Sequence, residues 1–359
     1  MSQSNQEHSI GFALVGCGQI AQKYASLLKD HLAEAKLVAV CDIAPEKAQT
    51  LGEKYAIPWF SNTHQMMTQL GDKIDVISVL TPSGYHCKNV LELARYGKHL
   101  CVEKPMALTL KDADAMIEAC KQAGIYLFVV KQNRLNLPIQ KLKQALNQGR
   151  LGKLVLGSIC LRWCRPQSYY DNDKWRGSMA LDGGVFANQA SHFIDLLQWL
   201  MGNVESVVAK GATRLVNIEA EDTGIALLKF SNGALGVVEA TTAARPSNLE
   251  GSLTILGEKG TVEIGGIGVN EMRVWKFTEP QEEDEVIFGK LKEEQHINNL
   301  GHLNYLKTVI QTLKYGAPPF LDGKEGRRSL ELLVAIYESI ETGKEVYLGT
   351  DVYHSRLGR

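Results

Sequence analysis

The chain has 359 residues, of which 45% are hydrophobic, so its length predicts about two domains with ordinary apolar cores. Its 39 basic and 40 acidic residues give a formal net charge of −1, which argues against a nucleic-acid-binding surface and an acidic tail. The longest apolar runs are far shorter than the roughly 18–20 residues that span a bilayer, and the polar residues 1–9 lack the apolar core of a signal peptide. We expect those residues to be a disordered leader and the protein to be cytoplasmic, without nucleic-acid or membrane partners.

Cysteine usage is typical of a reduced protein. Seven is an odd number, and no two cysteines form a C-x-x-C pair. Most lie within apolar stretches, where thiols are buried. The seven are Cys17, Cys41, Cys87, Cys101, Cys120, Cys160 and Cys164. The last two have no histidine nearby at the spacing of a zinc site, so we predict no metal centre.

The first ordered stretch, residues 12–42, has the order of a nucleotide-binding βαβ unit. An apolar strand at 12–15 leads into a glycine turn at 16–21. A helical pattern follows, and then a second apolar strand at 36–41 that ends at Asp42. A G-x-G-x-x-A turn alone is weak evidence, because glycine turns are common. The flanking strands, the spacing and the terminal acid favour a dinucleotide site, and a plain βαβ unit is the alternative.

Each residue of this unit has a physical role if a dinucleotide lies across the turn. Gly16 permits the tight turn, Gly18 lets the backbone approach a pyrophosphate, and Ala21 lets the helix pack on the strand. The helix N-terminus offers backbone N–H groups and the positive end of its dipole to the phosphates. Asp42 lies 21 residues past Ala21, where a carboxylate accepts from a ribose 2′-hydroxyl and repels a 2′-phosphate. Ile43 adds no positive charge, so the sequence predicts NAD rather than NADP.

The alternation of strands and helices continues to about residue 130. Further strands are predicted at 57–60, 74–80, 99–102 and 126–130, with helices at 45–55, 63–70 and 86–96 and one that Thr109 caps and Gly124 ends. Repeating units of this kind form a doubly wound parallel sheet, which binds ligands at the carboxyl ends of its strands. Three unusual loops follow strands at that edge, at 16–21, 81–86 and 103–105.

After residue 134 strands dominate. They are predicted at 155–162, 204–212, 225–230, 234–240, 253–256, 261–264 and 272–277, with helices at 138–148, 183–200, 302–314 and 324–341. The Ser-Asn-Gly turn at 231–233 is a strong hairpin signal. We therefore predict an α/β protein with a Rossmann domain at residues 1–130 and an α+β domain at 131–359, whose sheet is open and mostly antiparallel.

The loop Glu103-Lys104-Pro105 follows a buried strand, in the crevice that a nicotinamide would reach. Away from such a crevice, a lysine beside a proline is most simply a solvated loop charge. In a cofactor crevice, a lysine can polarise or deprotonate a substrate hydroxyl. Lys104 is therefore a candidate catalytic residue.

A second candidate site lies at 182–195, where two glycines precede a predicted helix. Asn188, His192 and Asp195 follow at i, i+4 and i+7, so they would share one helix face. A buried structural histidine is the simpler interpretation, because apolar residues continue the same face. The glycine pair permits close approach of the backbone to a ligand, which favours a functional histidine.

Together these motifs resemble the Gfo/Idh/MocA oxidoreductases, over the whole chain. The motifs are the G-x-G-x-x-A turn, Thr81-Pro82 with His86, Glu103-Lys104-Pro105, and Gly183-Gly184 leading to His192. The resemblance implies NAD as cofactor, a homodimer or homotetramer, and Lys104 and His192 as the catalytic pair around the reacting carbinol. The family often has aspartate four residues before the histidine, where this chain has Asn188. Without that carboxylate the imidazolium is less stabilised.

The resemblance also implies which residues bind the ligands. Residues expected to bind NAD are Gly16, Gly18, Gln19, Ile20, Asp42, Thr81, Pro82, His86, Glu103, Lys104 and Gln132. Residues expected to bind or act on the substrate are Lys104, Asn133, Arg134, Arg165, Tyr169, Tyr170, Arg176, Asn188, His192 and His302. The arginines suit a uronic carboxylate and a diphosphate, and the tyrosines could pack against a sugar ring.

Several stretches look like one branch of the family. They are 129–134, 165–171, 174–177, 248–252, and Gly301-His302 with Tyr305. That branch oxidises the 3-hydroxyl of UDP-N-acetylglucosaminuronic acid on the way to sugars of bacterial surface polysaccharide, such as the lipopolysaccharide O-antigen. The resemblance therefore implies a UDP-sugar 3-dehydrogenase.

The sequence is compatible with more than one assignment of the catalytic base and with more than one function. We favour His192 as the base and charged Lys104 as its electrostatic partner, and the reverse assignment is the alternative. Other functions are the oxidation of another sugar or polyol such as inositol, and a non-catalytic regulator that senses the cofactor. The presence of both Lys104 and His192 argues against a regulator.

Overall fold

The computed structural model describes residues 9–293, 300–349 and 353–359, so the predicted leader lies outside the described residues except for Ser9. The chain divides into two compact units. The first comprises Met1–Ala107, Lys111–Val130 and His302–Arg327, and the second comprises Leu108–Leu110, Lys131–Gly301 and Arg328–Arg359. Neither unit is one continuous stretch, because a segment from near the end of the chain belongs to the first.

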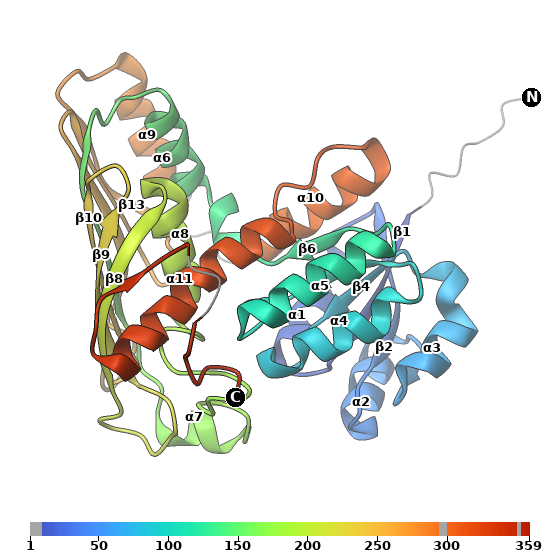
Figure 1. Ribbon diagram of the computed structural model, residues 1–359. Helices are drawn as coiled ribbons and strands as arrows, with labels where there is room; N and C mark the ends of the chain where they lie inside the picture. The colour runs from blue at the N-terminus through green and yellow to red at the C-terminus, as the bar shows by residue number, and fades with distance from the viewer. Residues whose placement is uncertain (1–8, 294–299, 350–352) are drawn as a thin grey trace, which may run out of the picture. The chain divides into compact units, whose positions relative to one another are not determined.

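In the described part of the first unit, six parallel strands form one sheet in the order β3-β2-β1-β4-β5-β6 (Figure 1). The strands are β1 (Ile10–Val15), β2 (Ala35–Cys41), β3 (Trp59–Phe60), β4 (Val76–Val79), β5 (His99–Val102) and β6 (Leu127–Val129). The helices are α1 (Gln19–Asp30), α2 (Pro45–Tyr55), α3 (Thr63–Leu70), η1 (Gly71–Lys73), η2 (Ser83–Tyr85), α4 (His86–Ala94), α5 (Leu110–Gln122) and most of α10 (Leu300–Tyr315). This strand order is that of a dinucleotide-binding Rossmann sheet, which confirms the predicted fold class.

The central strands of this sheet are buried on both faces. Every residue of β1 and of β4 is buried, and Phe12 and Leu14 are 0% exposed. Such burial is typical of a parallel sheet with helices on both faces. The strand order reverses between β1 and β4, so the loops that follow these two strands flank the point where such sheets bind ligands.

The second unit is built on an eight-stranded sheet, counted over the described residues, in the order β13-β12-β11-β7-β10-β9-β8-β14. Its strands are β7 (Leu154–Arg162), β8 (Val204–Ala212), β9 (Thr223–Phe230), β10 (Leu235–Thr241), β11 (Glu250–Gly257), β12 (Gly260–Gly265), β13 (Glu271–Phe277) and β14 (Val346–Tyr347). Its helices are η3 (Gln132–Leu135), α6 (Leu137–Asn147), α7 (Gln167–Asp171), α8 (Ser191–Met201), α9 (Glu282–Glu293) and most of α11 (Gly323–Thr342). All neighbours pair antiparallel except β7 and β10, and the hairpin predicted at 231–233 joins β9 to β10 as expected.

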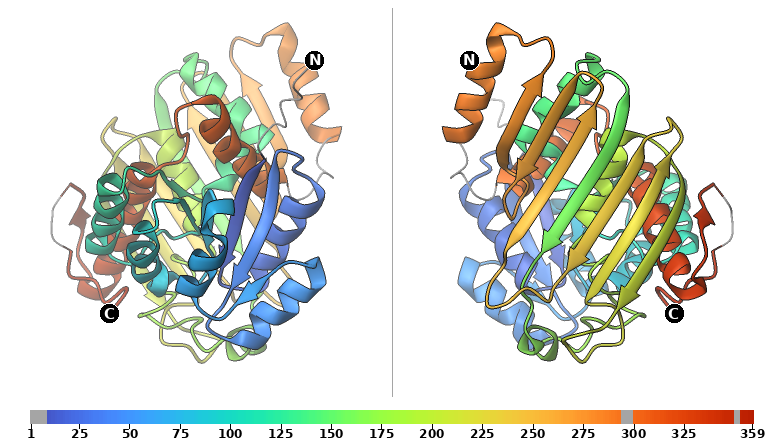
Figure 2. Two further views of the ribbon diagram at one scale, coloured as in Figure 1. Left: turned by 90° about the vertical axis from the view of Figure 1, so that its right-hand side faces the viewer. Right: turned by 90° about the vertical axis from the view of Figure 1, so that its left-hand side faces the viewer.

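The two faces of this sheet differ. Along β9, buried and exposed residues alternate strictly after the first position, as they do in a strand with one face in the core and one in solvent. Helix α8 packs so closely on β7 that a Cβ atom on Gly157 would lie 2.7 Å from a methyl of Leu197. The right-hand view of Figure 2 shows the opposite face, on which the strands are uncovered within the described chain.

The helix expected at 183–200 is shorter than predicted, and this changes the surroundings of Asn188. Helix α8 begins at Ser191, and residues 183–190 form turns. Gly183 adopts a φ of 80°, in the left-handed region that glycine tolerates best. The expectation that Asn188 shares a helix face with His192 is therefore wrong, because Asn188 precedes the helix.

Candidate active site

The glycine turn after β1 leaves room for a ligand against its backbone. Gly16 has a φ of 99°, and a Cβ atom there would lie 2.7 Å from the backbone carbon of Leu80. Only glycine fits this approach of the two strand ends. Gly18 is exposed, and a Cβ atom placed on it meets nothing within 4 Å. Helix α1 starts directly after Gly18 with no side-chain cap and no acidic residue in its first turn, so its N-terminal N–H groups suit an anion.

Asp42 holds the turn and presents its carboxylate beside it. One oxygen accepts from the backbone N–H of Cys17 at 2.7 Å, and the other accepts from that of Ala44 at 2.9 Å. Each carboxylate oxygen can accept a further bond, for example from a ribose hydroxyl. Ile43 is 92% exposed and brings no cation for a 2′-phosphate. At the start of α1, Gln19 is exposed and Ile20 is partly exposed. These residues fit an NAD molecule.

His86 ties together two of the loops at the strand ends. Its ring nitrogens lie 2.9 Å from the carbonyl oxygens of Thr81 and Pro105. The side chain is 1% exposed, and burial lowers its pKa although both carbonyl contacts raise it. Thr81 also donates from its hydroxyl to Asn89 at 2.8 Å. His86 therefore holds the two loops together. Thr81 and Pro82 are partly exposed and lie on the surface of their loop.

Lys104 leaves β5 beside a buried carboxylate. Glu103 is 8% exposed. Its carboxylate accepts from the Tyr24 hydroxyl and from the Lys104 backbone N–H, each at 3.1 Å. It also lies 3.4 Å from Nε2 of His302. Burial would raise the pKa of Glu103, but the hydrogen bond with His302 and the charge of Lys104 hold it below the ordinary value. His302 is itself buried in the first unit, on α10. Lys104 remains partly exposed.

In the second unit, the turns before α8 are held by Asp182. Its carboxylate accepts from the backbone N–H of Gly177 at 2.8 Å and from the side-chain amide of Asn188 at 2.5 Å. Asp182 is 1% exposed, whereas Asn188 is partly exposed. The carboxylate that family resemblance leads one to expect at position 188 is thus replaced by an amide that is bonded to another carboxylate.

Glu221 and Tyr337 anchor the same turns, and sequence reasoning missed both. Glu221 accepts from the Tyr337 hydroxyl at 2.8 Å and from the Phe186 backbone N–H at 3.0 Å, and the Tyr337 oxygen accepts from the Gly184 N–H at 2.7 Å. A Cβ atom on Gly184 would lie 2.2 Å from the Glu221 carbonyl oxygen, so this contact requires glycine. Burial raises the pKa of Glu221 to about 7. No local motif marks residues that are 116 positions apart.

His192 is the second residue of α8 and contacts the 3₁₀-helix η3. Its Nε2 lies 3.0 Å from Nε2 of Gln132, which is 8% exposed. Nearby, Arg134 donates twice to Asp195 at 2.8 Å, and Lys131 pairs with the same carboxylate at 3.4 Å. Burial alone would raise the pKa of Asp195, but these two cations hold it below its ordinary value. The structure therefore brings Gln132 and His192 together and pairs Arg134 inside the unit.

The remaining predicted substrate residues form an arginine–aromatic cluster near α7. The Tyr169 ring lies 5.3 Å from the guanidinium carbon of Arg165 and 4.5 Å from that of Arg176. Arg176 also donates to the Tyr169 hydroxyl at 2.6 Å and to Asp173 at 3.0 Å. Tyr170 is buried and contacts Thr242 through its hydroxyl. Arg165, Tyr169 and Arg176 are partly exposed, so they can meet a ligand, as can Asn133 on η3, which is also partly exposed.

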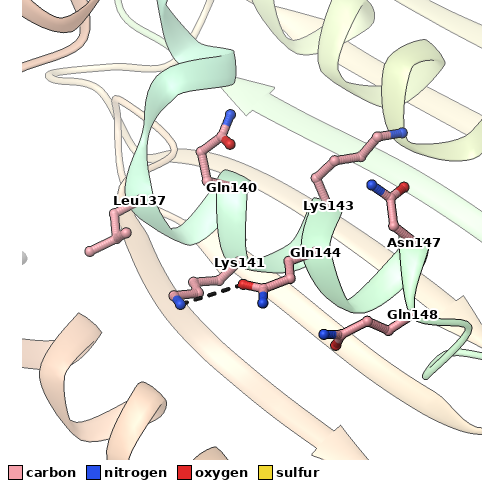
Figure 3. Close-up of a pocket in the computed structure, with 7 residues that line it drawn as sticks. All are labelled: Leu137, Gln140, Lys141, Lys143, Gln144, Asn147 and Gln148. Carbon is pink, nitrogen blue, oxygen red and sulfur yellow. Dashed lines mark hydrogen bonds between the residues drawn. The ribbon is translucent and has the colours of Figure 1, made fainter.

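A surface hollow of about 430 Å³ lies elsewhere, along the outer side of α6. Figure 3 shows its lining, which comes from α6 and from Gln148 directly after it and includes Gln140, Lys141 and Gln144. None of the predicted site residues lines it. Over the described chain, no group of three or more His, Cys, Asp or Glu residues is placed to hold a metal ion. Among the described helices, none is both long and apolar enough to cross a membrane.

Comparison with known proteins gives whole-chain similarities to solved structures, two of them at 43–44% identity. The WlbA dehydrogenase of Bordetella pertussis, crystallised with NADH and UDP-GlcNAcA, is 44% identical, with 96% of this chain and 99% of that chain covered and a TM-score of 0.92. The WlbA dehydrogenase of Chromobacterium violaceum, crystallised with the same two molecules, is 43% identical, with 97% and 98% covered and a TM-score of 0.90. The myo-inositol 2-dehydrogenase of Thermotoga maritima is 29% identical over 93% of this chain and 97% of its own length.

Family profiles match both parts of the chain. The Gfo/Idh/MocA profile described as an NAD-binding Rossmann fold matches residues 10–131, which include the glycine turn and Asp42. The profile of the family's C-terminal alpha/beta domain matches residues 143–348. The chain therefore belongs to the Gfo/Idh/MocA oxidoreductase family and is an NAD-dependent dehydrogenase.

Proposed function

We propose that this dehydrogenase oxidises the 3-hydroxyl of UDP-N-acetylglucosaminuronic acid (UDP-GlcNAcA) to the 3-keto sugar. The observation that carries the proposal is the 43–44% identity, over 96–97% of the chain, to two WlbA dehydrogenases whose structures hold NADH and UDP-GlcNAcA. A ligand with a carboxylate and a diphosphate needs cations. The partly exposed Arg165 and Arg176 support the proposal.

Lys104 and His192 are the proposed catalytic residues. NAD, when bound, supplies the acceptor for the hydride that leaves C3. His192 would take the C3-hydroxyl proton as general base, and the charge of Lys104 would stabilise the developing alkoxide. Glu103 supports this role of Lys104, because its carboxylate accepts from the Lys104 backbone N–H. Asn188, fixed to Asp182, is the proposed polar neighbour at the start of the His192 segment.

The substrate residues fall into two groups. Arg165, Tyr169, Arg176 and Asn133 are partly exposed, and we propose that they contact the substrate directly. Arg134, Tyr170 and His302 are buried, and they contact Asp195, Thr242 and Glu103, respectively. We propose that these three residues support the substrate site indirectly, by holding the segments around it in place.

The proposal is tested by substrate choice. Purified enzyme and NAD are mixed with UDP-GlcNAcA, UDP-GlcNAc or myo-inositol, and NADH absorbance is followed. We expect UDP-GlcNAc to be turned over about 100-fold less efficiently than the acid, because charged hydrogen bonds of roughly 1.5–3 kcal/mol each are lost. Equal turnover of UDP-GlcNAc would show that no residue recognises the carboxylate.

A second function has one observation in its favour. The myo-inositol 2-dehydrogenase of Thermotoga maritima is similar over 93% of this chain, although at 29% identity. Oxidation of a free polyol is therefore the alternative. Rapid turnover of myo-inositol with no turnover of UDP-GlcNAcA would establish it.

The uncovered face of the second sheet supports a homodimer or homotetramer. Val208 and Leu227 pair across β8 and β9, Leu227 pairs with Val237 across β9 and β10, and Val208 and Leu227 are 38% and 55% exposed. With Ile225, which is 53% exposed, they form an apolar stripe that a second copy of the chain would bury. Leu227→Glu should lower the mass measured by light scattering, and an unchanged oligomer would contradict the assignment of this face.

We also propose a pathway and a cellular compartment for the reaction. The 3-keto group of a UDP-hexuronic acid can be aminated in a later step. Such a product therefore suits the synthesis of bacterial surface polysaccharide such as O-antigen. The seven free thiols, four of which are buried, support a cytoplasmic setting. Accumulation of UDP-GlcNAcA in a strain without the enzyme would test the pathway.

A further inference from the structure

Two loops of the second unit meet where the parallel neighbours β7 and β10 end. Trp163 and Arg165 follow β7, and Arg245 lies in the segment after β10. The backbone N–H of Trp163 donates to the carbonyl oxygen of Thr241 at 2.9 Å, and the carbonyl oxygen of Trp163 accepts from Ala244 at 3.1 Å. The backbones of the two loops are therefore fixed against each other.

The side chains of Arg165 and Arg245 are held close together by neutral groups. Nη1 of Arg165 donates to the carbonyl oxygen of Cys164 at 2.7 Å, and Nη1 of Arg245 lies 3.7 Å from Sγ of the same cysteine. Nη2 of Arg245 donates to the carbonyl oxygen of Arg165 at 3.1 Å. Their other acceptors are the side-chain oxygen of Asn248 and the carbonyl oxygens of residues 242 and 244. Within the described chain, no carboxylate pairs with either guanidinium.

This arrangement keeps two positive charges together and leaves donors free on both. The two charges repel each other, and no described carboxylate offsets them. Nε of each guanidinium, and Nη2 of Arg165, donate to no described residue. Arg245 is exposed and Arg165 is partly exposed. Guanidinium groups with free N–H donors suit a carboxylate or a phosphate.

Trp163 adds a third donor. The guanidinium carbon of Arg165 lies 5.0 Å from the centroid of its ring. Its indole Nε1 is buried and has no hydrogen-bond partner among the described residues, which is costly unless an acceptor reaches it. The ring also contacts that of Phe193 edge to face, with centroids 6.1 Å apart, and Phe193 directly follows His192. The three donors therefore lie beside the segment that carries the candidate base.

We propose that Arg165, Arg245 and Trp163 form one anion-binding site that takes the carboxylate of the hexuronic acid, with Arg245 as a specificity-determining residue. The carboxylate is the charged group of the sugar ring on which His192 is proposed to act, and Trp163 lies beside the His192 segment. The inference rests on the proposed function, and it names the residues that distinguish UDP-GlcNAcA from UDP-GlcNAc. The diphosphate, which both molecules carry, is the alternative anion.

The first test measures binding, so it does not depend on turnover. Calorimetry of NADH-loaded enzyme gives the affinities of UDP-GlcNAcA and UDP-GlcNAc. Arg245→Gln should weaken binding of the acid by roughly 10- to 100-fold, the scale of a hydrogen bond between charged groups, and leave binding of UDP-GlcNAc unchanged. Arg245→Lys should restore part of the affinity for the acid, because it keeps the charge without the planar fork.

The control removes the same charge elsewhere in the second unit. Arg328 donates to the side chain of Asn203 at 2.7 Å, beyond the end of α8 that is opposite His192. Arg328→Gln should leave the affinities of both ligands unchanged.

The second test uses the wild-type chain and does not depend on how the Arg245 variants fold. Nitrogen-15 spectra of tryptophan-labelled enzyme, with Trp163 assigned through Trp163→Phe, report the indole N–H directly. UDP-GlcNAcA should move the Trp163 proton resonance downfield, as a new hydrogen bond to a carboxylate does, and UDP-GlcNAc should not. The resonance of Trp275, whose Nε1 already donates to Asp284 at 2.8 Å, should stay in place.

The outcomes separate this inference from the proposed function. If folded Arg245→Gln weakens both ligands equally or weakens neither, or if the Trp163 resonance does not move, the inference is overturned even when UDP-GlcNAcA is oxidised. A loss specific to the acid and a shifted Trp163 resonance, together with no NADH formation from any UDP-sugar, would support the anion site and refute the proposed reaction.

Discussion

Glu103 in the first unit and Glu221 in the second are both buried carboxyl groups beside candidate catalytic segments, and their pKa values move in opposite directions. Hydrogen bonding to His302 and the charge of Lys104 keep the pKa of Glu103 low despite its burial. Burial raises the pKa of Glu221 to about 7, and its partners, Tyr337 and a backbone N–H, are neutral. Burial therefore does not decide the charge of a carboxyl group, because the charge of its partners does.

The same contrast describes the surroundings of Lys104 in the first unit and of His192 in the second. In the first unit, Lys104 is placed by a carboxylate that remains charged. In the second unit, His192 contacts a neutral amide, and the turns before it are held by a carboxyl group that titrates near neutral pH. Glu103 is thus held by charged partners, whereas Glu221 is held by neutral ones.

The largest effect is expected from the catalytic pair. Lys104→Met and His192→Ala should each lower kcat by about 10²-fold or more, the scale of a positioned acid–base group. NAD affinity should stay near that of the wild type, because neither side chain belongs to the glycine turn. Stopped-flow NADH formation and calorimetry measure the two quantities. Near-normal hydride transfer in His192→Ala would reduce the histidine to a structural residue and leave Lys104 as the base.

The second effect concerns stability against pH. The pKa of Glu221 is about 7 in the folded chain against a reference of 4.5, so the folded state binds the extra proton between these values. Its contribution to the free energy of unfolding should therefore fall as pH rises from about 4.5 to 7, by roughly 3 kcal/mol in all. Urea unfolding of wild type and Glu221→Gln at pH 5 and pH 8 measures this. The variant should be the more stable protein at pH 8, and equal pH dependence of the two would refute the assignment.

Glu103 should show the opposite sign. Because its pKa is held below the reference of 4.5, its stabilising contribution is present above that value and is lost as pH falls further. Glu103→Gln should therefore lose stability at pH 7 relative to wild type, and the two proteins should converge at acidic pH. Convergence at alkaline pH instead would contradict the comparison.

A smaller effect is expected at Asp42. Asp42→Ala removes a carboxylate that suits a ribose 2′-hydroxyl and repels a 2′-phosphate, so the preference for NAD over NADP should narrow by about 10-fold, the scale of one hydrogen bond to a charged group. Asp42→Asn is the matched control, because its oxygen can still accept from a backbone N–H of the turn. Calorimetric titration with both cofactors gives the ratio. Comparable binding of NAD and NADP by the wild type would show that Asp42 does not select the cofactor.

The smallest effect is expected from Tyr24→Phe, which removes one hydroxyl that donates to Glu103 at 3.1 Å. Because His302 and the Lys104 N–H still face that carboxylate, the loss should be about 1 kcal/mol of stability. Urea unfolding measures it. A loss several times larger would mean that Tyr24, and not His302, keeps Glu103 charged.

More of the first unit than of the second could be predicted from the sequence, and the reason is physical. The glycine turn, Asp42 and the Glu103–Lys104 loop are short local motifs whose positions follow from a parallel sheet, so fold class and cofactor could be predicted. The partners of His192 come from distant segments, and no spacing rule connects Gln132 or Glu221 to it. The error at Asn188 has the same origin. Its bond to Asp182 and the close approach of Gly184 to Glu221 keep residues 183–190 in turns, and helical periodicity cannot reveal such contacts.

The central claim, oxidation of a UDP-hexuronic acid at C3 with NAD, has one direct test. UDP-GlcNAcA carrying deuterium only at C3 is incubated with the enzyme and NAD, and the reduced cofactor is weighed by mass spectrometry. We predict that the deuterium appears in the reduced cofactor and that the labelled substrate reacts more slowly in a single turnover. Reduced cofactor without deuterium, or no reduced cofactor at all, would contradict the account.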